Sequence, residues 1–171
     1  MALNIQTKAS CAKIALRLRP VTAATTAVVT ILSVSSGGST THNVTFSGGT
    51  TTLQINTSAL AASTGVFMIS VTEAGMATPV VSKALLIHCD IDCCLAKLTN
   101  ELLACECDCP RCSSALAKAQ KIYLLLQSAI AKVEEINSHP NGSTVMGEYD
   151  DIADKYKKAK ELCDGSCGCE C

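Results

Sequence analysis

The distribution of cysteine constrains the fold of this chain more than any other feature of its sequence. Of the 12 cysteines, only Cys11 lies in the first half of the 171-residue chain. The others form three groups: Cys89, Cys93 and Cys94; then Cys105, Cys107, Cys109 and Cys112; then Cys163, Cys167, Cys169 and Cys171. Thiols at this density are usually cross-linked or bound to metal. The second half of the chain must therefore fold so that distant cysteines meet.

Residues 1–88 have the pattern of a β-sheet protein. Ile14, Leu16 and Leu18 alternate with charged residues, as expected for a strand with one buried face. Further short apolar or alternating runs occupy residues 27–34, 44–46, 53–55, 66–71 and 80–87. Small polar turns, such as the one at residues 36–39, separate these runs. The pattern predicts an antiparallel β-sandwich of immunoglobulin-like size.

Residues 89–171 have a helical pattern instead. We expect a first helix near residues 95–104, a second from Ser113 or Ser114 to about Ser138, and a third over about 147–163. The segment His139-Pro140-Asn141-Gly142 predicts a tight turn, so the last two helices should pack antiparallel. The expected fold class is α+β, with a β-sandwich domain over 1–88 and a Cys-rich α-helical hairpin domain over 89–171.

A zinc site is the predicted use of the later cysteines. The second cysteine group precedes the long helix and the third follows the returning helix, so a hairpin should bring both groups to one end. Cys-x-Cys repeats direct several thiols into one small volume, and the Cys109–Cys112 spacing is that of a structural zinc knuckle. The eight candidate ligands are Cys105, Cys107, Cys109, Cys112, Cys163, Cys167, Cys169 and Cys171.

Other uses of these thiols stay open at this point. A ladder of disulfides would suit a protein that meets an oxidising environment, and it would be able to tie the 89–94 group to the hairpin. A two-zinc or iron–sulfur cluster and unpaired buried thiols are further alternatives. We interpret the 89–94 group as a packed junction between the two domains rather than a ligand set. His88 is a candidate fourth ligand or half of a thiol–imidazole pair, although a structural role is favoured.

Several classes of function are disfavoured by composition and charge. The formal net charge is −1 and no basic run is present, which argues against nucleic-acid binding. Residues 1–10 lack the pattern of a signal peptide, and residues 21–34 are too short and too rich in β-branched residues to span a bilayer. We therefore expect a soluble protein made in a cytoplasm, without membrane insertion. Only three histidines are present, and no acid stands at a motif spacing from any of them, so we expect no catalysis.

Parts of the sequence resemble structural proteins of tailed bacteriophages, especially phages of aquatic and cyanobacterial hosts. The resemblance begins at Cys89-Asp-Ile-Asp-Cys-Cys-Leu-Ala-Lys-Leu-Thr-Asn-Glu-Leu, and continues through residues 105–112 and 118–129. Residues 65–73 look like a late strand of a small phage sandwich domain. Such proteins are known as virion components, so the resemblance implies a place in a particle and carries over no catalytic or binding residue.

The sequence thus predicts a non-enzymatic virion subunit of a tail, neck or fibre attachment. Its expected partners are other virion proteins and copies of itself, and its expected location is the virion, after assembly in the host cytoplasm. Two alternatives are a standalone thiolate-rich metal-binding protein and an extracellular filament or adhesion subunit held by disulfides.

Overall fold

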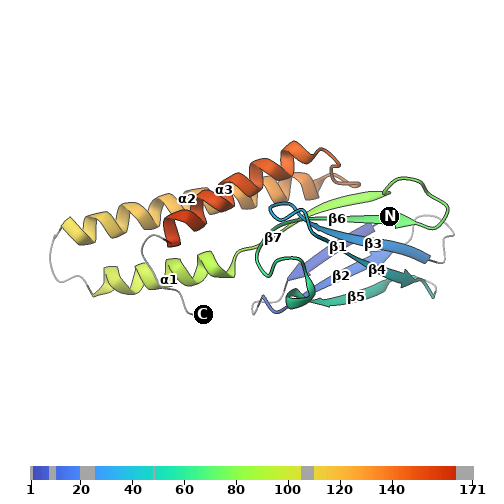
Figure 1. Cartoon of the computed structure of the whole chain (residues 1–171), viewed down its shortest axis with the longest axis horizontal. Coiled ribbons are helices and arrows are strands. Elements are labelled where there is room, and N and C mark those ends of the chain that lie inside the picture. The colour runs from blue at the N-terminus through green and yellow to red at the C-terminus, as the bar shows by residue number, and fades with distance from the viewer. Residues whose placement is uncertain (1, 8–10, 20–25, 48, 105–109, 165–171) are drawn as a thin grey trace.

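The computed structural model describes residues 2–7, 11–19, 26–47, 49–104 and 110–164. In this part of the chain seven strands precede three helices, and the strands form two antiparallel sheets (Figure 1). One sheet has the strand order β1-β2-β5, with bounds Ala2–Thr7, Lys13–Arg19 and Thr51–Asn56. The other has the order β4-β3-β6-β7, with bounds Ser39–Thr45, Thr26–Ser33, Gly65–Glu73 and Val81–Ile87. A short 3-10 helix, Thr57–Ala59, follows β5.

Alternating side chains build one core between the two sheets. In β2, Ile14, Leu16 and Leu18 are buried, and the charged residues between and beside them are exposed. Residues of the four-stranded sheet enter the same core: Ala27, Val29, Ile31, Val44, Phe67, Ile69, Val71, Val81, Leu85 and Ile87. Full burial of one such side chain contributes about 1.5–3 kcal/mol. The period of two in the sequence therefore fixes which face of each strand turns inward.

Three helices follow β7 and cover one part of the four-stranded sheet. They are α1 (Cys89–Leu103), α2 (Pro110–Ser138) and α3 (Met146–Asp164), and α2 and α3 lie side by side (Figure 1). Their apolar faces form a second core: Ile91, Leu98, Ile122, Leu126, Ala129, Ile136, Tyr149, Ile152, Tyr156 and Ala159. Val66 of β6 and Ala84 of β7 belong to this core as well. Among the described elements, α2 therefore packs on β7 and α3 packs on β6, whereas α1 packs mainly on α2 and α3, and no helix makes extensive contact with β3 or β4.

The α+β class and the C-terminal position of the helices are confirmed. The helix α1 begins at Cys89, earlier than expected, and Asp90 and Asp92 stand in its first turn, where the helix dipole favours acids. The helix α2 begins at Pro110, before Ser113, because proline is well suited to the first turn of a helix. Within the described ranges, no helix is both long and apolar enough to cross a bilayer. The immunoglobulin-like class and the domain boundary at residue 88 stay predictions.

Candidate functional site

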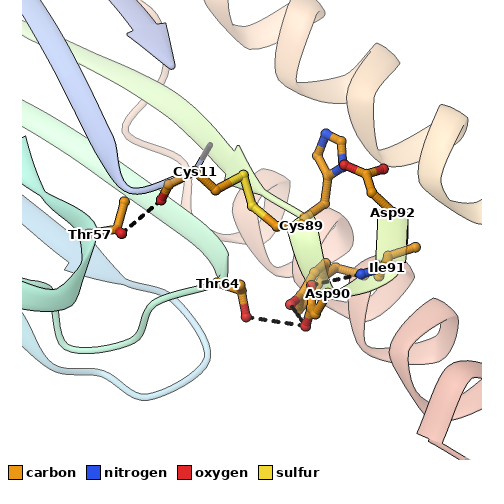
Figure 2. The surroundings of a disulfide bond; sticks show 9 residues. Cys11, Thr57, Thr64, Cys89, Asp90, Ile91 and Asp92 are labelled. Atoms are coloured by element: carbon orange, nitrogen blue, oxygen red, sulfur yellow. Dashed lines mark hydrogen bonds and ion pairs between the residues drawn. A yellow bond between two sulfur atoms is a disulfide. The ribbon is translucent and has the colours of Figure 1, made fainter. Parts of the chain in front are cut away.

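The candidate site is the junction where the helices meet the sheets. A disulfide crosses this junction (Figure 2). Cys11, just before β2, is bonded to Cys89, the first residue of α1, across 78 residues of sequence. Cys11 has a φ of +49°, which a side chain with a Cβ rarely adopts. Its carbonyl accepts a hydrogen bond of 2.8 Å from Oγ1 of Thr57, so Cys11 is held through both its side chain and its backbone.

A second disulfide lies inside the helical core. Cys94 of α1 is bonded to Cys163 near the end of α3, with a Cα–Cα distance of 5.8 Å. Both residues are buried, whereas Cys11 and Cys89 are only partly buried. The alternative in which disulfides tie the 89–94 group to the hairpin is thus the one that the structure supports. Cys93 and Cys112 are also disulfide-bonded.

A polar cluster beside the first disulfide joins α1 to α3 and to the loop before β6. Oδ2 of Asp90 accepts hydrogen bonds from the hydroxyls of Tyr156, at 2.7 Å, and Thr64, at 3.2 Å (Figure 2 shows the contact with Thr64). The ammonium of Lys160 lies 3.0 Å from the same oxygen. Oδ1 of Asp90 accepts a hydrogen bond from the backbone N–H of Ile91, at 3.0 Å. One carboxylate at the start of α1 therefore binds α3 and the loop that leads into β6.

Charge and burial act in opposite directions on this carboxylate. Burial alone would raise the pKa of Asp90, but the hydrogen bonds from Tyr156 and Lys160 and the charge of Lys160 outweigh it and hold the pKa below its usual value. Burial, together with the neighbouring Asp90 charge, raises the pKa of Tyr156. The cluster is thus built to keep Asp90 ionised and Tyr156 neutral, and this is the arrangement in which the tyrosine donates to the carboxylate.

Beside this cluster lies an open cavity of about 660 Å³ between α3 and the loops of the sheet. Thr64, Tyr156 and Lys160 form part of its lining. Its other charged residues are Asp150, Asp154 and Lys157, so acids and bases balance. The lining therefore favours neither an anion nor a cation.

A further contact fastens the helices to the free edge of β7. The side-chain amide of Asn137, near the end of α2, accepts a hydrogen bond from the N–H of Ala84 and donates one to its carbonyl, both at 2.9 Å. It thereby takes the place of a peptide group in a neighbouring strand. The ammonium of Lys83 donates to the carbonyls of Asn137, at 2.8 Å, and His139. Lys83 is only 6% exposed, and this burial lowers its pKa.

The turn between α2 and α3 continues this contact along the edge. The N–H of Ser82 donates to the carbonyl of Asn141, and the N–H of Ser143 donates to the carbonyl of Ser82. Gly142 between them has a φ of +65°, and a Cβ there would lie 1.5 Å from the Ser82 carbonyl oxygen. Only glycine fits this position. The predicted turn therefore also forms an isolated parallel β-bridge with β7, between Gly142 and Ser82.

The predicted zinc ligands do not form a described metal site. Cys105, Cys107, Cys109, Cys167, Cys169 and Cys171 lie outside the described residues. Of the two others, Cys163 is bonded to Cys94 and Cys112 is also in a disulfide. No cluster of three or more potential metal ligands occurs among residues that the structure describes. For the described cysteines, disulfides are therefore the supported alternative to zinc, and the eight-cysteine ligand set stays a prediction.

The lengths of the two helices explain why Cys112 and Cys163 are not brought together. The helix α2 has 29 residues and α3 has 19, so the first turns of α2 extend beyond the end of α3 (Figure 1). At 1.5 Å per residue this places Cys112 roughly 15 Å further along the hairpin than Cys163. Cys163 instead lies beside α1, which packs on both α2 and α3. Unequal helix lengths were visible in the sequence and are the signal that the zinc prediction missed.

Three further residues of the junction were missed by sequence reasoning. Lys83 holds an inward position in a mostly apolar strand, and this pattern signals an edge strand. Asp90 occupies the first turn of a helix, which indicates a structural acid but not its partners. Asn137 carries no local signal. His88, a candidate ligand, lies with its Nδ1 3.0 Å from Oδ2 of Asp92, and its neighbour Cys89 is cross-linked, so no thiol–imidazole pair forms.

No protein-family model matches the chain, and no curated protein matches it significantly.

Proposed function

We propose that this protein is a non-enzymatic structural subunit of a phage virion, at a tail, neck or fibre attachment. The observation that carries the proposal is the covalently closed junction. One disulfide joins the sheets to α1 and another joins α1 to α3. The arrangement suits a rigid part that transmits load between its two ends.

The disulfides also bear on where such a part would work. Disulfides are rare in a reducing cytoplasm and persist outside the cell. A virion subunit is made in the host cytoplasm and then released, so it would fold on its apolar cores first and become cross-linked afterwards. The thiols of Cys89, Cys94 and Cys163 would then be used for cross-linking, which leaves them no role as nucleophiles or metal ligands.

We also propose an immunoglobulin-like class for the two sheets. The chain passes from one sheet to the other between β2 and β3, between β4 and β5, and between β5 and β6. Crossings of this kind, with β3 next to β6, are typical of Greek-key sandwiches. Many cell-surface domains share this sandwich architecture, although the fold alone does not define a function.

The test is mass spectrometry of purified particles of the phage that encodes the chain, digested without reduction. We expect the chain to be present in particles, with cross-linked peptides for Cys11–Cys89 and Cys94–Cys163. Recovery of the chain only from the soluble fraction of the lysate would overturn the proposal. A metal-binding protein would be recovered there, with metal bound and free thiols.

One second candidate is favoured by a specific observation. The same disulfides suit an extracellular filament or adhesion subunit. The two functions differ in location, since an adhesion subunit would be found on the surface of uninfected cells. Fractionation of such cells, followed by detection of the chain with an antibody, distinguishes them.

A further inference from the structure

The two edges of the four-stranded sheet are treated differently. At one edge, the backbone of β7 is hydrogen-bonded to the side chain of Asn137 and forms a β-bridge with Gly142. The charged side chain of Lys83 also lies at this edge. At the other edge, β4 pairs with β3 on one side only, and no other described strand pairs with it. A free edge presents a row of backbone N–H and C=O groups that another strand can pair with.

The strand β4 lacks the devices that usually protect such an edge. It has seven residues, contains no lysine, no acid and no proline, and pairs with β3 without a bulge. Most of its residues are Thr or Val, which suit a strand. The Oγ1 of Thr40 and the Nε2 of His42 are buried and have no hydrogen-bond partner among the described residues. An incoming strand would bring its own polar groups beside these two atoms.

Charge decides which open edge suits a second copy of this chain. The strands β1 and β5 flank β2, which exposes Lys13, Arg17 and Arg19. Their sheet contains no acidic residue, so two copies that paired through it would bring like charges together. The four-stranded sheet has only Glu73 and Lys83 as charged residues, and both are buried. Pairing through β4 meets no such repulsion.

We propose that β4 pairs antiparallel with β4 of a second copy, about a twofold axis, and joins two four-stranded sheets into one. The uncovered outer faces of β3 and β4 would then form one uncharged surface across both copies. This inference deepens the proposed function, because virion subunits act in many symmetric copies. The contact is isologous, so any change in β4 acts on both sides of it.

The experiment is sedimentation velocity on the oxidised, full-length chain from about 1 to 100 μM, a range typical of moderate protein association. We expect the wild-type chain to be dimeric in the upper part of this range. Thr41→Lys places a charge on the exposed side of β4 in both copies and should raise the dimer dissociation constant about tenfold or more. The matched control is Gln54→Lys, at an exposed position of the edge strand β5, which should leave the dissociation constant unchanged.

Two further measurements complete the test. Thermal unfolding followed by circular dichroism should give similar midpoints for both variants, so that a lost dimer is not a lost fold. Hydrogen exchange at residues 39–45 should be slower in the wild-type dimer than in Thr41→Lys. A wild-type chain that stays monomeric, or a dimer that resists Thr41→Lys, would overturn the inference. Particle mass spectrometry tests the virion role separately, so the failure of one proposal is distinguishable from the failure of the other.

Discussion

The elements around the core between the two sheets and those around the core under the helices are held together by different kinds of contact. Between the sheets, every described strand is hydrogen-bonded through its backbone to at least one neighbour, and no described disulfide joins two strands. Under the helices the backbone hydrogen bonds stay within each helix, so side chains alone hold one helix to another. There the chain adds the Cys94–Cys163 bond and the Asp90 cluster. Covalent and charged contacts are concentrated where backbone pairing between elements is missing.

The apolar surface of the helices shows the same difference. Leu103 is 80% exposed and Leu124 is 67% exposed, whereas the central strand residues Val29, Phe67 and Ile69 are fully buried. The helical part of the molecule meets the sheet mainly through α2 and α3, while α1 packs on those two helices, so this part leaves more apolar surface exposed. Its stability therefore depends more on cross-links than does that of the sheets, and the following predictions test this dependence.

Removal of the buried disulfide should have the largest effect. The double variant Cys94→Ala/Cys163→Ala opens a loop of 69 residues, and chain entropy predicts a loss of about 4 kcal/mol in the free energy of unfolding. The loss of stability should be confined to the helices. It is measured by urea unfolding, with the helical signal recorded by far-ultraviolet circular dichroism. The matched control, Cys11→Ala/Cys89→Ala, opens a similar loop at the junction. Equal loss of helical signal at low urea in both variants would contradict the assignment of the buried bond to the helices.

Truncation of one core residue in each region should sharpen the comparison. Ile69→Ala in β6 and Ile152→Ala in α3 each remove a fully buried side chain and should cost about 3 kcal/mol. Reduction with a thiol reagent breaks both described disulfides, but only the Cys94–Cys163 bond joins two elements inside one core. Reduction should therefore lower the melting temperature of Ile152→Ala much more than that of Ile69→Ala. If reduction lowers both melting temperatures equally, the helices do not depend on disulfides more than the sheets do.

Acid should weaken the junction through Asp90. Its pKa is lowered in the folded protein, so its contribution to stability is present above the usual value of 3.8 and is lost as the pH falls through the folded value. Asp90→Asn should cost about 1 to 2 kcal/mol at pH 7 and should flatten the loss of stability below pH 4. The control is Asp92→Asn, whose side chain is 54% exposed and which should change stability little. Urea unfolding from pH 2 to pH 7 measures the free energy of unfolding of both variants. If the stability of Asp90→Asn still falls steeply below pH 4, other carboxylates are responsible for the loss.

Alkali should weaken the helices through their tyrosines, since all three tyrosines lie there. Burial, with a smaller contribution from the Glu148 charge, raises the pKa of Tyr149 from 10.0 to about 12. The neutral form is therefore favoured by folding, and its contribution is present below pH 10 and is lost between pH 10 and about 12. Tyr149→Phe should cost about 1 kcal/mol at pH 7, because it removes the 2.7 Å hydrogen bond to the Ser143 carbonyl.

The loss of stability at alkaline pH should be smaller in Tyr149→Phe than in the wild-type chain, as measured by the helical circular dichroism signal between pH 9 and pH 12. The control is Tyr123→Phe, at a position that is 53% exposed. A sheet signal that is lost before the helical signal would contradict the comparison.

Local pattern predicted the elements of the fold well. The alternation of Ile14, Leu16 and Leu18 identifies a strand and its buried face from sequence neighbours alone. The turn at residues 139–142 was equally clear, because proline and glycine restrict the backbone locally. Such features need no knowledge of the rest of the molecule.

The site depends on packing over long distances and could be predicted only in part. Cys94 meets Cys163 because α1 lies against α3, and the docking of α1 is decided by the combined burial of Ile91 and Leu98. Cysteine spacing suited either metal or disulfides, and it contains no information on the relative lengths of α2 and α3. Asn137 was unpredictable for a related reason, since its partner is the backbone of Ala84, which any residue type would provide.

The covered edge of β7 has a consequence for synthesis. The ribosome completes β7 before it adds the residues of the turn at Gly142, so the strand leaves the tunnel with its edge open. At about 5–20 residues per second, several seconds pass before the turn can reach that edge. During this interval the Lys83 charge discourages nascent chains on one message from pairing through β7. After the hairpin docks, the same ammonium donates to the carbonyls of Asn137 and His139 at the end of α2. A charge that disfavours strand pairing in the nascent chain thus becomes a contact between the helices and the sheet.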